Sequence, residues 1–590
     1  MDFSFQMRSF DMLVKFLKHD LAHMPVFDTG KRNRFSCAGS PSPLPRSTPE
    51  AQGVPSGAVL KLIKAISSGK DMNAHSFVIL RHSHVIAEGS WAPYRANCPH
   101  MLYSVSKSVT GTAAGIAADE GLLDPDESIA DIFKDRVTPS QSIVMRKITV
   151  RHLLTMSSGI RFNEPGTAFC DDWVKMFLSS VPKFEPGSAF EYNSLNTYML
   201  SAILREKTGM GLVEYLTPRL FEPLGISEAD WEVCPKGIEK GGWGLSLTTE
   251  DAAKLGQLYL NMGMWNGKQI LSRKWVEEAT KSHIPTPNGE CRYGYGYQIW
   301  MHDDEGAYQF NGAFGQHVIV LPKCDVVISI ASGATKLFSG SLLAGLIKEF
   351  ASQLSGIPLK ENPAEFNELD SMIKGLVYAL DAPVSVSTDK SVLTGIAESL
   401  SGSEYLLKSN IGGAFPFILQ CVYGNFTSGI SGIRFIKTER GFNAELYEQT
   451  DCNTLIFTEG IACSEFSVKG ERQPVGMRTQ WRRDEDGTIV LFAAVSFIKT
   501  PNTRIFTFTI KDGRIHVQFD ESPGVGSAVA MYCEITGLNQ LEYYRKLIPV
   551  LAQERLQKKI REIASPTAEG HKAEPASDSP EELRCERPSG

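Results

Sequence analysis

The sequence lacks the features that mark several classes of protein. Its 590 residues contain 60 lysines and arginines against 67 aspartates and glutamates, which gives a net charge of −7. A nucleic-acid-binding protein normally carries clustered basic residues in excess, so the composition argues against that class. The sequence also contains no run of 18 consecutive apolar residues, which is about what a membrane-spanning helix needs. We therefore expect neither a nucleic-acid partner nor a membrane partner.

The sequence also shows no secretory signal and no metal motif. Asp11, Lys15 and Lys18 interrupt the apolar residues near the N-terminus, whereas a signal peptide has an apolar run of about 7–15 residues. The eleven cysteines form no Cys-x-x-Cys pair, so neither a zinc site nor a redox motif is indicated. His82 and His84 are a poor metal pair without further ligands. These observations predict reduced thiols, a cytoplasmic location and no metal or cofactor.

The chain does contain enough apolar residues, 42% of the total, for more than one folded domain. Strand-like segments lie at both ends of the region 46–357, with helical periodicity between them, which predicts an α+β domain. The region 364–537 is rich in alternating, strand-like segments and predicts a smaller, β-rich domain. The segment 1–45 is interpreted as an N-terminal extension, and 538–590 as a helix followed by a disordered tail.

A serine followed three residues later by a lysine is a known nucleophile arrangement when it opens a helix. The spacing occurs six times in the sequence, so it is weak evidence by itself. Only Ser104 and Lys107 begin a long segment of small residues that ends near Gly121, as a buried helix would. On that helix the two side chains share one face, and the helix N-terminus favours a developing negative charge. The alternative is that Ser104 is an ordinary helix N-cap.

The surrounding motifs resemble one family. In order, these motifs are Met101–Ser108, Ile148–Gly159, Phe190–Ser194, Gly242–Ser246, Tyr293–Tyr297 and Gly312–Gln316. Together they resemble the serine β-lactamase and penicillin-binding-protein superfamily, in its class C-like esterase and amidase branch, over about residues 46–355. The resemblance implies an antiparallel sheet flanked by helices, together with an all-helical subregion.

The resemblance also implies roles for three residues. Ser104 would be the nucleophile that forms an acyl-enzyme, Lys107 would hold it, and Tyr192 would be the general base or acid. A free phenol has a pKa of about 10, so it can act as a general base near neutral pH only beside a cation. Without the family, Tyr192 would be interpreted as a core tyrosine. A Ser-His-Asp triad through His152 is the weaker alternative, since the family uses this residue structurally.

The sequence departs from the family at two motifs. The usual Tyr-x-Asn is replaced by Tyr192-Asn193-Ser194, so that either Ser194 or Asn193 takes the place of the asparagine. The usual Lys- or His-x-Gly is replaced by Phe310-Asn311-Gly312. The missing cation would weaken binding of a substrate carboxylate. Gly312 would still allow close approach of the substrate.

The oxyanion-binding group implied by the resemblance is the backbone N–H of Ala313, beside that of Ser104. Asp172 and Trp173 could line the pocket, or they could pack the fold.

The departures favour a serine hydrolase that cleaves a small neutral ester or amide, in a chain that could form a homo-oligomer. The alternatives are a β-lactamase, a D-amino-acid peptidase or DD-carboxypeptidase, and an inactive scaffold or binding protein. The role of the β-rich domain is left open.

Overall fold

The structure is a computed structural model. The residues that it describes are 31–36, 42–69, 71–160, 167, 170–286, 293–302, 306–335, 340–378, 389–408, 412–524, 562 and 565–573. The chain divides into two compact units. Among the described residues, the first unit spans 31–91 and 95–377, and the second spans 92–94 and 378–573.

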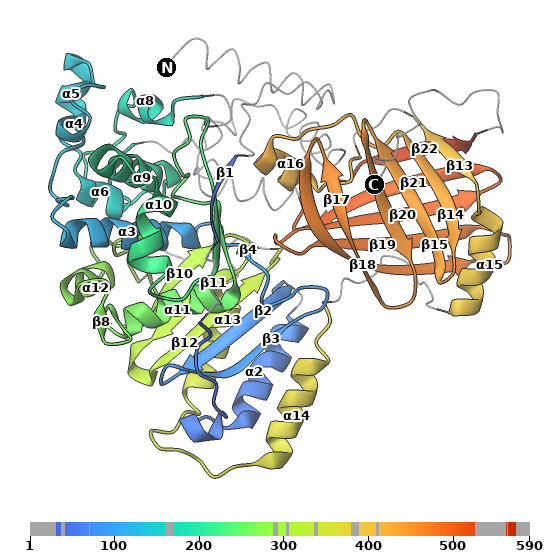
Figure 1. Cartoon of the computed structure of the whole chain (residues 1–590), viewed down its shortest axis with the longest axis horizontal. Coiled ribbons are helices and arrows are strands. Elements are labelled where there is room, and N and C mark those ends of the chain that lie inside the picture. Colours follow the sequence, from blue (N-terminus) through green and yellow to red (C-terminus); the bar gives the residue numbers. More distant parts are fainter. Residues whose placement is uncertain are drawn as a thin grey trace, which may run out of the picture. The chain divides into compact units, whose positions relative to one another are not determined.

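A six-stranded antiparallel sheet forms the base of the first unit (Figure 1). Its strands, in spatial order, are β3 (His84–Ser90), β2 (Ala74–Arg81), β12 (Val326–Ser332), β11 (Gln316–Leu321), β10 (Tyr308–Gly312) and β9 (Trp300–Met301). Strands from the two ends of the unit meet at its centre, where Ile79 pairs with Ile328. Their buried, β-branched side chains suit a sheet covered on both faces. This arrangement confirms the predicted α+β class.

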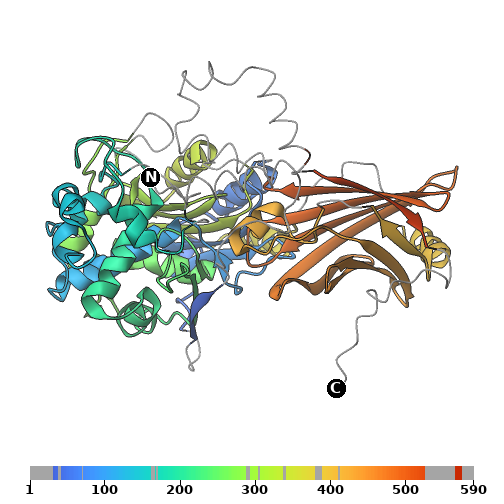
Figure 2. The same ribbon diagram turned by 90° about the horizontal axis from the view of Figure 1, so that it is seen from above.

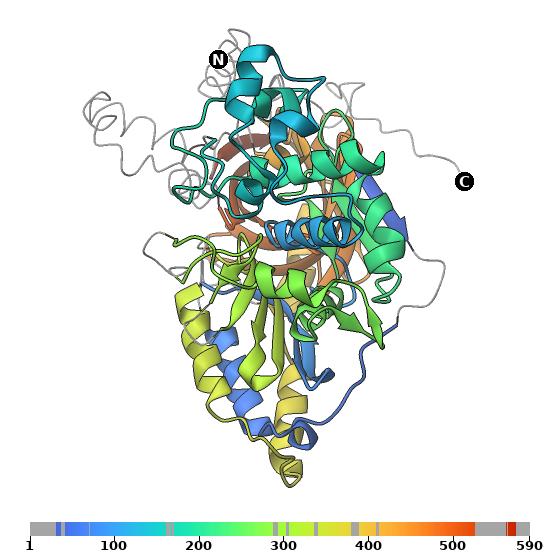
Figure 3. The same ribbon diagram turned by 90° about the vertical axis from the view of Figure 1, so that its left-hand side faces the viewer.

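Helices cover both faces of this sheet. On one face α2 (Ser56–Ser68) packs against α13 (Gly340–Ala351) and α14 (Pro363–Lys374), and Figure 3 shows these three helices side by side. On the other face α11 (Thr249–Leu260) packs on β2, β11 and β12. The sequence assigned residues from 364 onward to the β-rich domain, but α14 belongs to the first unit because it packs on α2.

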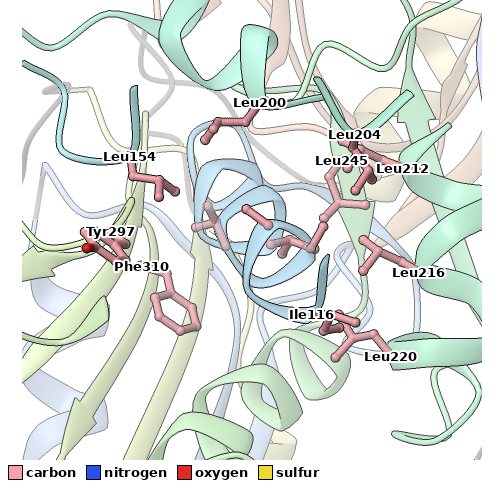
Figure 4. Packing of buried hydrophobic residues seen from close by; sticks show 14 of the residues in the cluster. Ile116, Leu154, Leu200, Leu204, Leu212, Leu216, Leu220, Leu245, Tyr297 and Phe310 are labelled. Carbon is pink, nitrogen blue, oxygen red and sulfur yellow. The ribbon is translucent and has the colours of Figure 1, made fainter. Parts of the chain in front are cut away.

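The rest of the first unit is mainly helical and surrounds α3 (Val105–Asp119). Figure 4 shows Leu200, Leu204, Leu212 and Leu216 on one side of α3 and Phe310 on the other. The other helices here are α4 (Ile129–Ile132), α5 (Pro139–Met145), α6 (Val150–Leu154), α8 (Trp173–Leu178), α9 (Ser194–Thr208), α10 (Leu212–Leu216), a π-helical turn (Thr217–Phe221) and α12 (Arg273–Ala279). The small residues of α3 let these helices approach its axis closely, which buries it from Val105 to Ala117.

A second, four-stranded sheet has the order β1 (Arg32–Ser36), β5 (Glu228–Glu232), β6 (Leu245–Leu247) and β4 (His100–Met101). The short hairpin β7 (Met264–Trp265) and β8 (Lys268–Gln269) stands apart from both sheets. Strand β1 falls in the segment that the sequence assigned to an N-terminal extension. It pairs along its whole length with β5, so that part of the extension belongs to the first unit.

The second unit is a ten-stranded antiparallel sheet that curls into a near-barrel (Figure 2). In spatial order its strands are β16 (Asp451–Phe457), β15 (Gly441–Glu448), β14 (Gly432–Thr438), β13 (Glu404–Leu407), β22 (Thr567–Lys572), β21 (Arg514–Ser522), β20 (Thr503–Lys511), β19 (Ile489–Phe497), β18 (Glu471–Arg483) and β17 (Ile461–Val468). At the seam, the Asn453 side chain donates to the Ser467 carbonyl at 2.9 Å and accepts from its N–H at 2.7 Å. This side chain stands in for a backbone pair between β16 and β17.

Two helices, α15 (Lys390–Leu400) and α16 (Phe417–Tyr423), accompany this sheet. A hairpin at Lys511–Arg514 joins β20 to β21. Phe506, Phe508 and Phe519 of these strands are fully buried, so this face of the sheet forms a core.

Strand β22 corrects the expectation of disorder after residue 565. It lies between β13 and β21 and pairs with both. Ala568 is the one buried apolar side chain of this strand. Backbone hydrogen bonds to the two neighbouring strands therefore hold a segment whose composition is typical of disorder. The helix predicted from residue 538 onward falls outside the described residues, apart from position 562.

Among the helices of the described residues, none combines the length and the apolar character that crossing a bilayer requires.

Candidate active site

Ser104 stands at the junction between β4 and α3, directly after a residue with left-handed backbone geometry. Tyr103 has φ +47°, a conformation that costs a non-glycine residue energy and is often found at functional sites. The Ser106 hydroxyl holds this turn by donating to the Tyr103 carbonyl at 2.6 Å and accepting from the Leu245 N–H at 3.1 Å. Ser104 occupies the N-cap position, but its side chain makes no capping hydrogen bond. Its hydroxyl is therefore not used as a helix cap.

Lys107 contacts that hydroxyl from one turn further along α3. Its Nζ donates to Ser104 Oγ at 2.9 Å, to Ser194 Oγ at 2.8 Å and to the Gly242 carbonyl at 2.7 Å. The side chain is only 2% exposed. An ammonium group has three donors and no acceptor, so these three oxygen partners match the three donors of a protonated lysine.

Tyr192 completes the cluster from the segment just before α9. The Lys107 Nζ lies 4.7 Å from the centre of the Tyr192 ring. Trp300 of β9 also contacts this tyrosine, and its ring stacks on Tyr192 with the ring centres 5.6 Å apart at an angle of 25°. Phe190 and Tyr295 in turn pack against Trp300. The structure thus brings Ser104, Lys107 and Tyr192 together, with an aromatic cluster that fixes the tyrosine ring.

Ser194, and not Asn193, takes the place of the usual asparagine beside Lys107. The Asn193 side chain caps α9 by accepting from the Leu195 N–H at 3.0 Å, and it donates to the Ile160 carbonyl at 2.8 Å. A Cβ on Gly242 would lie 2.8 Å from the Ser194 carbonyl oxygen and 2.9 Å from its Cβ. The carbonyl that Lys107 uses can approach only because position 242 has no side chain.

The end of β10 lies directly against the nucleophile's backbone. A Cβ on Gly312 would lie 2.3 Å from the Leu102 carbonyl oxygen and 3.2 Å from the Ser104 nitrogen. Ala313 is half-buried and follows Gly312 in the turn to β11. Asn311 is buried and lies opposite His317 in the ladder.

Phe310 provides no cation at the position where the family has one. Its side chain is buried in the core of the first unit, with its ring packed edge to face against Tyr259 at 5.2 Å. An apolar ring thus stands where the family has a cation, and it packs between the sheet and α11.

The remaining candidate residues make structural contacts. His152 accepts from the Thr149 N–H at 3.1 Å and caps α6, and burial lowers its pKa. Asp172 caps α8 and pairs with Arg136 at 3.0 Å. Trp173 is buried and stacks on Trp243 at 5.6 Å.

The described residues contain no group of three or more His, Cys, Asp or Glu side chains placed to hold a metal ion. His84 contacts the carbonyl of His82 in a tight hairpin, which is a structural contact.

Two contributors escaped the sequence analysis. The Gly242 carbonyl accepts from Lys107, and Trp300 stacks on Tyr192. A carbonyl belongs to the backbone and has no residue-type signature, and a tryptophan at a strand edge is equally typical of a core. Only the three-dimensional placement assigns these groups to the site.

Comparison with known proteins identifies the first unit. Residues 60–351 match the family model named Beta-lactamase. The chain is 28% identical over 281 residues to the 6-aminohexanoate-dimer hydrolase of Paenarthrobacter ureafaciens, covering 43% of this chain and 71% of that protein. It is 23% identical to penicillin-binding protein 4 of Amycolatopsis lactamdurans, covering 49% of this chain and 86% of that protein.

A solved structure, a putative 6-aminohexanoate-dimer hydrolase from Bacillus anthracis, is 22% identical with a TM-score of 0.46 and covers 57% of this chain and 93% of that one. The nucleophile segment and the matched region together define the class: residues 60–351 belong to the serine β-lactamase and penicillin-binding-protein superfamily. The chain is accordingly a serine hydrolase.

Proposed function

We propose that this hydrolase cleaves an ester or an amide of a small neutral molecule through an acyl-enzyme on Ser104. The observation that carries the proposal is the buried Lys107, whose ammonium group donates to Ser104 Oγ at 2.9 Å and lies 4.7 Å from the Tyr192 ring centre. Burying a lysine beside a serine is costly unless the charge is used or fully paired. That cost argues against an inactive scaffold.

In the proposed mechanism the Tyr192 phenolate accepts the proton of Ser104 Oγ as this oxygen attacks the substrate carbonyl carbon. The carbonyl oxygen becomes an oxyanion, which the backbone N–H groups of Ser104 and Ala313 stabilise. Tyr192 then returns the proton to the leaving alcohol or amine, which departs and leaves the acyl group on Ser104. A water molecule then attacks the acyl carbon while Tyr192 accepts its proton, and Tyr192 returns this proton to Ser104 Oγ as the acid leaves. Lys107 stays protonated throughout and favours the phenolate electrostatically.

A neutral substrate is favoured because the cleft lacks the family's carboxylate-binding cation. Phe310 stands in that position and is buried in the core. Ser194 replaces the asparagine that would bind the side-chain amide of a β-lactam. The name of one relative, 6-aminohexanoate-dimer hydrolase, supports an amide as an alternative to an ester.

The first experiment treats the purified protein with a fluorophosphonate probe and locates the label by peptide mass spectrometry. We expect the label on Ser104, and we expect Ser104→Ala to lose labelling and at least about 1000-fold in turnover of p-nitrophenyl acetate, because the acyl-enzyme cannot form. Ser67→Ala is the matched control, since Ser67 opens another Ser-x-x-Lys motif and donates to the Ile63 carbonyl at the end of α2. Full turnover in Ser104→Ala would refute the assignment.

Nitrocefin separates the proposal from the β-lactamase alternative. Slow or absent turnover supports a neutral ester or amide, and rapid turnover would show that Phe310 and Ser194 do not exclude β-lactams. A DD-carboxypeptidase or D-amino-acid peptidase would release D-alanine from a D-Ala-D-Ala peptide.

We also propose a cytoplasmic location and a homo-oligomer. Cell fractionation tests the location, and light scattering of the purified chain tests the oligomeric state.

A further inference from the structure

The turn that carries Ala313 has an unusual backbone. Gly312 of β10 pairs with Gln316 of β11, so Ala313, Phe314 and Gly315 form a three-residue loop. Phe314 and Gly315 both have left-handed geometry, with φ +62° and +83°. Phe314 in this conformation is strained, so contacts from outside the loop must hold the turn in place.

Gln316 supplies most of these contacts through a single amide group. Its side chain is fully buried. The amide nitrogen donates to the carbonyls of Ser332 at 2.7 Å, Phe314 at 3.2 Å and Ala313 at 3.3 Å. Its oxygen accepts from the Ser332 N–H at 3.3 Å. The turn is therefore fastened to the rigid end of β12.

The geometry of this contact resembles a backbone pair. The ladder between β11 and β12 ends where His317 pairs with Ile330, and the Gln316 amide continues it by donating to and accepting from Ser332. The Phe314 carbonyl also accepts from the Ala334 N–H at 2.9 Å. The Gln316 side chain, which belongs to β11, thus links the turn to the end of β12.

This turn adjoins the nucleophile, as the 3.2 Å between a Cβ on Gly312 and the Ser104 nitrogen shows. We infer that Gln316 is a positioning residue that fixes the Ala313 N–H as the second oxyanion donor; this inference rests on the proposed acyl-enzyme function. Oxyanion donors are effective because they are oriented before the charge develops. A shift of about 1 Å in such a group costs up to about 100-fold in rate.

The test compares Gln316→Met with Gln309→Met. Methionine has nearly the same length but no N–H, so the carbonyls of Ala313, Phe314 and Ser332 lose the Gln316 donor and the turn relaxes. Gln309 is a buried glutamine of β10 whose amide contacts His317 at 3.3 Å, which makes it a matched control away from the turn. We expect kcat for p-nitrophenyl acetate to fall about 10- to 100-fold in Gln316→Met with KM nearly unchanged, and both constants to stay near wild type in Gln309→Met.

A second readout separates oxyanion binding from a general loss of structure. Sulfur is a weaker hydrogen-bond acceptor than oxygen, so an oxyanion hole favours p-nitrophenyl acetate over its thiono analogue. We expect this oxygen-to-sulfur rate ratio to fall in Gln316→Met and to stay unchanged in the control. A loss of correctly folded protein alone would lower both rates equally and leave the ratio constant.

Wild-type kcat and an unchanged ratio in Gln316→Met would overturn the inference while leaving Ser104 labelling intact. If that variant does not fold, Gln316→Glu replaces it: the carboxylate keeps the acceptor for Ser332 and lacks both N–H donors. We expect the same loss of kcat in Gln316→Glu, partly recovered as the pH falls and the acid regains one donor; wild-type kcat in it at pH 8 would overturn the inference. Absence of label on Ser104 in the wild type would instead refute the proposed function.

Discussion

At the scale of single residues, the site depends on how closely two backbone segments approach α3. Lys107 uses a carbonyl that only a glycine at position 242 allows so near Ser194, and Gly312 brings the end of β10 within reach of Ser104. The missing side chain at position 242 therefore leaves room for the carbonyl group and the Cβ of residue 194.

Tyr192 can be tested by removing one oxygen atom. We expect Tyr192→Phe to lower kcat about 100- to 10,000-fold, because general acid–base transfer contributes about that much. KM should change little, since the ring and its stacking on Trp300 are retained. Steady-state kinetics with p-nitrophenyl acetate measures both constants.

Tyr198→Phe is the control for Tyr192→Phe. Tyr198 lies on α9, and its hydroxyl contacts the sulfur of Cys234 at 3.3 Å in the core, so its loss should leave kcat near wild type. Equal activity of Tyr192→Phe and the wild type would remove Tyr192 from the mechanism.

Much of the site could be predicted from the sequence through the resemblance, but its support could not. Ser104, Lys107 and Tyr192 lie in recognisable motifs, and the structure brings them together. Ser194, and not Asn193, could be assigned to the place of the family's asparagine only once the structure showed that the Asn193 side chain caps α9. The acceptor at Gly242 and the anchor at Gln316 depend on contacts between segments far apart in the chain, which no local pattern encodes.

At the scale of elements, helix α3 shows why a run of small residues is needed at the centre of the unit. A Cβ on Gly115 would lie 2.4 Å from Nε1 of Trp275 on α12 and 2.6 Å from its Cδ1. The indole is buried in the core of the first unit. The glycine thus sets the distance between α3 and α12.

We expect Gly115→Ala to lower the free energy of unfolding by about 1–3 kcal/mol, the usual cost of overpacking a core. This would outweigh the gain that alanine normally brings to a helix interior. Gly345→Ala is the control, because Gly345 lies on α13 with no atom within 4 Å of its added Cβ. That variant should gain about 0.5–1 kcal/mol. Urea denaturation of both variants measures the two signs, and a stabilised Gly115→Ala would contradict the packing argument.

Elements with strong periodic patterns were predicted well, and elements held by backbone pairing were not. Helix α3 lies where the small-residue composition indicated a helix, and strands β2, β3, β11 and β12 lie toward the two ends of the region 46–357, where strand-like segments were expected. Strands β1 and β22 carry few buried apolar side chains, so their pairing partners define them and local composition does not. Strand β9 is short, and its Trp300 and Met301 pair with Gln309 and Tyr308 of β10.

At the scale of the whole molecule, the second unit contains buried charges that make its stability depend on pH. Glu521 of β21 pairs with Arg504 of β20 at 3.4 Å and accepts from the Phe417 N–H of α16 at 2.5 Å. Arg504 also donates to the Gly413 carbonyl at 3.0 Å, and Glu448 accepts from the Ala414 N–H at 2.8 Å. The two carboxylates and the arginine together fasten the segment around α16 to the sheet.

Burial dominates the charge state of these carboxylates. It raises the pKa of Glu521 to about 7, against the opposing effect of Arg504, with Asp520 acting in the same direction as burial. Burial also raises the pKa of Glu448 and lowers that of Arg504. The pKa of Glu521 in the folded state lies above its unfolded value of about 4.5. The folded state therefore binds the proton more tightly than the unfolded state does. The contribution of Glu521 to stability is complete below about pH 4.5 and is lost as the pH rises through about 7.

We therefore expect the second unit to lose up to about 3 kcal/mol of stability between pH 5 and pH 8, which is the pKa difference expressed as a free energy. Glu521→Gln mimics the protonated acid, so this variant should lose less over that range and should be more stable than the wild type at pH 8. The raised pKa of Glu448 adds a pH dependence of the same sign, which this variant keeps. Glu465→Gln, which removes an exposed carboxylate of β17, should behave like the wild type. Hydrogen exchange of β20 and β21 peptides in the full chain measures these differences, and a Glu521→Gln variant with the wild-type slope would show that the buried carboxylate stays ionised across this range.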